Sequence, residues 1–149
     1  MNILLTVGNG MMGDDGAGVL LAQMLHAHPL ENWTVISGGS APENVVHHLR
    51  EVDVSRVLIV DAADMDLPPG SIRLIHADRL EDPFFMTTHT LPLTFLIESL
   101  REFVPQVDLV GIQPSVVAFG FPIAEAVRLA VEQIYADLKN GVFAWSTCN

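Results

Sequence analysis

The sequence is poor in cysteine, in positive charge and in long hydrophobic runs. Of its 149 residues only Cys148 is a cysteine, so no internal disulfide can form, which favours a reducing compartment such as the cytoplasm. Seven basic side chains stand against eighteen acidic ones, giving a formal net charge of −11. That charge repels nucleic acid and anionic membrane surfaces. The longest apolar runs have the length of strands, and MNILLTVGNG predicts a first core strand rather than a signal peptide or a membrane span.

Strand-like and helix-like segments alternate along a chain of which half is hydrophobic. The length fits one domain, residues 1–149, with a substantial core. Strands are expected at residues 3–7, 33–37, 56–61, 71–76 and 107–112, and helices at 19–28, 42–52, 92–103 and 122–138. Only nine residues separate the third and fourth strands, too few for a parallel crossover, so the fourth should run antiparallel. The sequence predicts an α/β fold: a three-layer α/β/α sandwich around a five-stranded, mostly parallel sheet with one antiparallel strand.

The glycine-rich stretch GNGMMGDDGAG directly follows the first predicted strand. Gly8, Gly10 and Gly13 fit the spacing G-x-G-x-x-G of dinucleotide-binding turns. Asp14 and Asp15, however, put two negative charges where phosphate would bind, and the second predicted strand ends in SGG with no acid for a ribose. The pattern therefore disfavours a nucleotide site, and the glycines are expected to permit tight turns and a close approach to another chain or ligand.

Acidic side chains and one imidazole gather at the predicted carboxyl edge of the sheet, where open α/β sheets bind ligands. Asp14 and Asp15 follow the first strand, Asp61 ends the third with Asp64 after it, and His89 precedes a helix. Carboxylate and imidazole together suit nickel, zinc or iron, and a water activated between an acid and a base would use the same groups. For each aspartate alone, the structural alternative stays open: Asp14 or Asp15 capping the next helix, and Asp61 closing a turn.

Several other residues give weaker signals. Met11 and Met12 either grip a peptide from an exposed loop or fold back onto the core. Ser40 is expected to cap a helix, because it lacks the strained turn of a nucleophilic serine. Cys148 is a poor candidate nucleophile because chain ends fray. The five histidines other than His89 are expected to be structural.

Five segments in order resemble the hydrogenase maturation peptidases: VGNGMMGDDGAG, GGSAPEN, LIVDAADM, MTTHTLPL and GIQP. Within that family the sequence is most similar to the HycI-type branch, which processes the large subunit of hydrogenase 3 (formate hydrogenlyase). The resemblance covers almost the whole chain up to about Gly141. It implies an α/β fold with one antiparallel strand, and an endopeptidase that removes a C-terminal extension from the large-subunit precursor after nickel insertion.

Carried over by motif, the family's three metal-contacting residues are Asp15, Asp61 and His89. Many relatives have glutamate at the first position, so this chain keeps the charge on a shorter arm. The resemblance further implies that nickel is carried by the precursor, that these residues complete its coordination, and that the enzyme is of the aspartic type without a covalent intermediate. We expect a monomer. The alternatives are a nickel-sensing chaperone without hydrolytic activity and a nucleotide-binding regulator; the tail FAWSTCN matches no pattern.

Overall fold

The computed structural model describes residues 1–39, 41–76, 90–143 and 145–147. Its strands are β1 Asn2–Val7, β2 Thr34–Gly39, β3 Arg56–Ala62, β4 Ile72–Ile75, β5 Gln106–Ile112 and β6 Ser146–Thr147. Its helices are α1 Ala17–Ala27, α2 Val46–Leu49, α3 Thr90–Arg101 and α4 Glu125–Asn140, with 3₁₀ turns η1 Gly13–Gly16 and η2 Pro42–Val45. Within these ranges, no helix combines the length and the apolar character that a membrane crossing requires.

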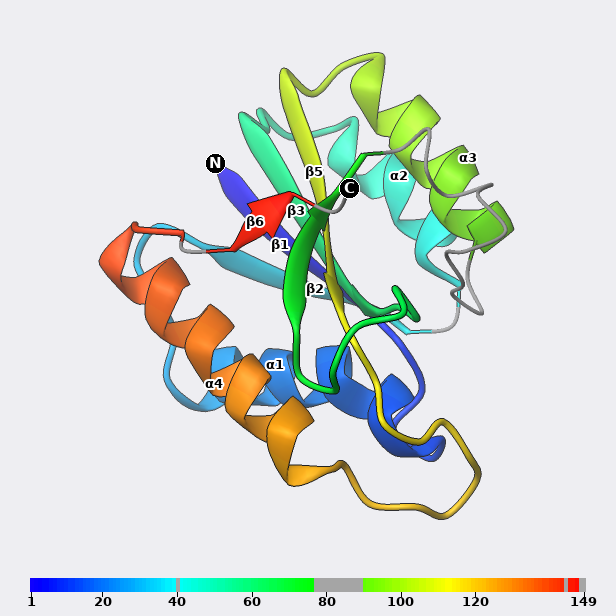
Figure 1. Cartoon of the computed structure of the whole chain (residues 1–149). Helices are drawn as coiled ribbons and strands as arrows, with labels where there is room; N and C mark the ends of the chain where they lie inside the picture. Colours follow the sequence, from blue (N-terminus) through cyan, green and yellow to red (C-terminus); the bar gives the residue numbers. More distant parts are fainter. Residues whose placement is uncertain (40, 77–89, 144, 148–149) are drawn as a thin grey trace.

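The strands form one sheet in the order β2-β1-β3-β5-β4-β6 (Figure 1). β1 pairs in parallel with β2 and β3, and β3 pairs in parallel with β5. β4 pairs antiparallel with β5, which confirms the predicted mixed sheet. The two-residue β6 was not predicted; it pairs in parallel with β4 and places part of the C-terminal tail at the sheet edge.

The two faces of the sheet are covered by different helix pairs, so the predicted three layers are confirmed (Figure 1). Side chains alternate along each buried strand. In β3, Val57 and Ile59 pack with the core under α2 and α3, while Leu58 and Val60 pack with the core under α1 and α4. This explains why β3 is apolar throughout: both of its faces are buried.

Two predicted helices differ from those observed. The segment predicted as one helix over 42–52 forms η2 followed by the single turn α2. The last helix begins at Glu125 rather than Pro122, because Ala124 is extended (φ −65°, ψ 149°). Its predicted end is confirmed by Gly141, which adopts the left-handed conformation (φ 72°) typical of a C-cap.

Candidate active site

Asp15 and Asp61 lie on neighbouring elements at the carboxyl edge of the sheet. Asp15 is part of η1, which contacts β3, and Asp61 is near the end of β3. Asp15 accepts a hydrogen bond at Oδ2 from the backbone N–H of Asn9, at 2.9 Å. The exposed fractions of Asp15 and Asp61 are only 5% and 1%. A protein substrate can therefore reach these carboxylates only if the atoms that cover them move.

The side chain of Asp61 lies on the sheet face that α3 covers, because successive residues of a strand point to opposite faces. It has the same parity in β3 as Val57 and Ile59, which belong to the core under α2 and α3. The helix α3 begins at Thr90, the residue after His89. His89 itself lies outside the described residues. Among the described residues, which do not include His89, no group of three or more histidine, cysteine, aspartate or glutamate side chains is arranged to hold a metal ion.

Asp14 has a different task from its neighbour Asp15. It is fully buried, and its carboxylate accepts three backbone hydrogen bonds: from Ser115 (2.7 Å) and Val116 (2.9 Å) at Oδ2, and from Ala124 (2.7 Å) at Oδ1. The backbone N–H of Asp14 also donates to the carbonyl of Val116, at 2.8 Å. Asp14 therefore fastens the loop between β5 and α4 to the glycine-rich loop.

Neither Asp14 nor Asp15 caps the first helix, so that structural alternative is wrong for both residues. The residue at the N-cap of α1 is Gly16, and no side chain donates or accepts a capping bond there. The carboxylates of Asp14 and Asp15 accept bonds from residues outside the helix because η1 directs them toward the β5–α4 loop and toward Asn9. No sequence signal near Asp14 indicates partners more than 100 residues away.

Two glycines of the G-x-G-x-x-G spacing, Gly8 and Gly13, pack against the protein's own backbone. A Cβ on Gly8 would lie 2.0 Å from the carbonyl oxygen of Asp15, and one on Gly13 would lie 2.6 Å from that of Val116. Gly18, in α1, lets the helix approach β1 so closely that a Cβ would lie 2.4 Å from the carbonyl oxygen of Val7. At these glycines the close approach is to the protein's own backbone.

Gln113 is a positioning residue that sequence reasoning missed, although its motif GIQP was noted. It is 6% exposed, and its Oε1 accepts hydrogen bonds from the backbone of Met65 (2.6 Å) and Leu67 (3.4 Å). Its Nε2 donates to Oδ1 of Asp64, at 3.0 Å. Gln113 thus holds the segment after β3 against the end of β5. A polar residue directly after a buried apolar strand was the available signal.

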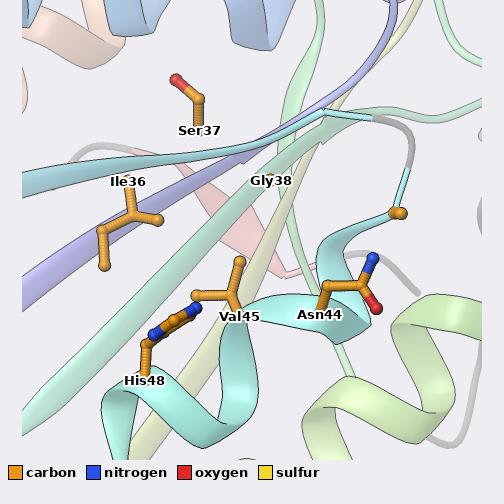
Figure 2. A pocket seen from close by; sticks show the side chains of 7 residues that line it. Ile36, Ser37, Gly38, Asn44, Val45 and His48 are labelled. Atoms are coloured by element: carbon orange, nitrogen blue, oxygen red, sulfur yellow. The ribbon is translucent and has the colours of Figure 1, made fainter.

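A pocket of about 610 Å³ opens between β2 and the η2–α2 segment (Figure 2). In Figure 2, Ile36, Val45 and His48 lie on the same side of β2, whereas Ser37 points away from them. Neither Asp15 nor Asp61 lines this pocket. Its lining residues are Ile36, Ser37, Gly38, Ala41, Asn44, Val45 and His48.

Solved structures with the same fold define the class of protein. The solution structure of the endopeptidase HycI from Escherichia coli superimposes with a TM-score of 0.92 at 47% identity, over 100% of this chain and 97% of that one. The crystal structure of a [NiFe] hydrogenase maturation protease HycI from Thermococcus kodakarensis KOD1 shares the fold, with a TM-score of 0.79 at 24% identity over 93% of this chain and 90% of that one. The fold is that of a maturation endopeptidase.

Sequence comparison identifies the family. The family model described as hydrogenase maturation protease (HycI) matches residues 19–140. The hydrogenase 3 maturation protease of Escherichia coli (strain K12) is 50% identical over 147 residues, which are 96% of this chain and 94% of that protein. The chain therefore belongs to the HycI family of hydrogenase maturation proteases, as its motifs predicted. It is a hydrolase of the endopeptidase kind, and its partner is a protein substrate.

Proposed function

We propose that this endopeptidase removes the C-terminal extension from the nickel-loaded large-subunit precursor of a [NiFe] hydrogenase of the hydrogenase 3 type. Asp15, Asp61 and His89 bind the nickel that the precursor carries, so the metal is part of the substrate. Docking on the metal brings the scissile bond into register with the carboxylates, which is a gain from orientation. The enzyme is of the aspartic type and acts as a monomer in the cytoplasm, with residues 1–149 forming one catalytic domain.

The separation of tasks between Asp14 and Asp15 is the observation that carries this proposal. Three backbone N–H groups occupy the carboxylate of Asp14, so Asp14 has a structural role. The carboxylate of Asp15, by contrast, accepts one bond, from the N–H of Asn9, and both aspartates sit on a turn that contacts β3, the strand that contains Asp61. The β5–α4 loop thus holds the carboxylate of Asp14 but not that of Asp15, which supports assigning the family's first acidic position to Asp15.

The chemistry is hydrolysis without a covalent intermediate. Asp15 or Asp61 takes a proton from the attacking water, and the water oxygen bonds to the carbonyl carbon of the scissile peptide. The C–N bond then breaks, and the released amine nitrogen receives a proton. In an alternative route the precursor's nickel polarises the carbonyl, and the carboxylates serve only as ligands.

Intact-mass measurement of a nickel-loaded precursor tests the proposal. The wild-type enzyme should shorten the precursor by the mass of its C-terminal extension, leave nickel-free precursor intact, and thereby reveal the scissile bond. His89→Ala should abolish cleavage while far-UV circular dichroism stays unchanged.

Asp64→Asn is the matched control: Asp64 is exposed at the same edge and accepts turn bonds that asparagine can also accept. Full cleavage by His89→Ala, or binding of the precursor by the wild type without cleavage, would contradict the proposed function.

A further inference from the structure

An exposed apolar surface lies beside Asp15. Five large hydrophobic side chains on the glycine-rich loop and the β5–α4 loop are between 40% and 75% exposed, and we call them the apolar rim: Met11, Val116, Val117, Phe119 and Phe121. Phe119 is the most exposed of them at 75%. Figure 1 shows the β5–α4 loop, in yellow and orange, projecting from the molecule beside the blue start of α1. Exposed apolar clusters on a folded protein mark interaction sites.

The backbone beneath the apolar rim is held firmly. The N–H of Gly120 donates to the carbonyl oxygen of Met11 at 2.9 Å, which joins the two loops of the rim. The buried carboxylate of Asp14 binds the same loop at both ends, through Ser115 and Val116 on one side and Ala124 on the other. Large apolar side chains on a fixed backbone lose little conformational entropy when a partner covers them, which makes them effective binding anchors.

The absence of charge around the apolar rim and its position beside Asp15 indicate what kind of partner binds there. Residues 109–124 and 1–13 contain no charged side chain, although the whole chain has a formal net charge of −11. The rim therefore offers nothing that attracts phosphate or an anionic membrane, and it suits an uncharged, apolar protein surface. It is also continuous with the candidate active site, since Asp14, which fastens the rim, directly precedes Asp15. The rim therefore lies on the two loops that flank and hold the turn that carries Asp15.

We propose that the apolar rim docks an apolar surface of the large-subunit precursor next to its scissile bond. This inference rests on the proposed function and adds a second point of recognition to the nickel ion. Contact through nickel alone fixes one point, and the rim supplies a second contact that strengthens binding of the substrate and of the transition state equally. Because the rim binds the substrate without taking part in the reaction, its loss should raise KM and leave kcat unchanged.

Cleavage kinetics of the double variant Phe119→Ser/Phe121→Ser test the role of the rim. We expect its KM for nickel-loaded precursor to rise at least about tenfold and its kcat to stay within about twofold, as for the loss of central aromatic anchors. The matched control is Val142→Ser, because Val142 is 68% exposed and follows α4 at its far end. Equal midpoints of urea unfolding for all three proteins establish that the variants fold.

The outcomes separate the two proposals. If the wild type cleaves the precursor and the double variant has an unchanged KM, the docking role of the rim is overturned while the proposed function stands. If the wild type fails to cleave, the proposed function itself fails. If the wild type dimerises in light scattering and the double variant is a monomer with unchanged KM, the rim is a self-association surface, which also overturns the inference. Weaker binding of precursor to Asp61→Asn when the two serines are added supports it.

Discussion

Acidic side chains have different partners at the two edges of the sheet. At the amino edge, where β3 and β5 begin, charges pair with charges: Arg50 with Glu102 at 2.8 Å, and Arg56 with Asp108 at 3.4 Å. At the carboxyl edge, the carboxylates of Asp14 and Asp15 are buried and accept hydrogen bonds from backbone N–H groups. Exposed ion pairs contribute little to stability, whereas a buried carboxylate with several donors is costly to disturb. Loss of a carboxylate should therefore have a larger effect at the carboxyl edge than at the amino edge.

The largest effect is expected from the carboxylates of Asp15 and Asp61. Asp15→Asn and Asp61→Asn should each reduce cleavage of nickel-loaded precursor at least about 100-fold, because the charge that binds metal or accepts a proton is lost. Asparagine keeps an acceptor for the N–H of Asn9, so the fold should be retained. Initial rates from intact mass spectra measure the effect, with Asp108→Asn as the control from the amino edge. A rate near that of the wild type in either variant would contradict the assignment.

The next effect is on stability, at Asp14. Asp14→Ala should lower the free energy of unfolding by about 3 kcal/mol or more, because three backbone N–H groups lose their acceptor in a buried setting. Urea denaturation measures the change. Glu102→Ala at the amino edge is the comparison, and it should cost no more than about 1 kcal/mol, because that carboxylate is exposed. Similar losses in the two variants would remove the distinction between the edges.

A moderate effect is expected where α1 meets β1. Gly18→Ala should lower the free energy of unfolding by about 1–3 kcal/mol, because the new methyl group would lie 2.4 Å from the carbonyl oxygen of Val7 and force the helix away from the strand. The control is Ala27→Gly at the last position of the same helix. A thermal midpoint for Gly18→Ala equal to that of the wild type would show that the contact is not tight.

The smallest effect is expected at an exposed ion pair at the start of α4. Hydrogen bonds from Arg128 lower the pKa of Glu125 below its ordinary value of 4.5. A lowered pKa in the folded state means that the contribution of Glu125 to stability is present above pH 4.5 and is lost as the pH falls through the folded-state pKa. The difference in Tm between the wild type and Glu125→Gln should therefore be small at pH 7 and shrink below pH 4.5. A difference that grows on acidification would contradict the pairing.

Periodicity and connection length were sufficient to predict the architecture. The nine residues between the third and fourth strands required an antiparallel strand, and β4 is antiparallel to β5. The two-residue β6 could not be predicted, since its pairing with β4 is set by the tertiary fold rather than by a local pattern.

The residue types of the candidate site could be predicted, but the different roles of Asp14 and Asp15 could not. Asp14 and Asp15 are identical in chemistry and adjacent in sequence, and only the hydrogen bonds from the distant β5–α4 loop distinguish them. The alternative in which Met11 grips a partner gained support, because its side chain is 63% exposed, whereas Met12 is partly buried. The predicted capping role of Ser40 lies outside the described residues.

The long sequence separation of the Asp14 contacts has a consequence for synthesis. The acceptor leaves the ribosome early, but its donors are 101 to 110 residues further along the chain. A nascent polypeptide that ends before Ser115 therefore lacks every one of these donors. Closure of the turn beside Asp15 by these three bonds is therefore a late event in the synthesis of the chain.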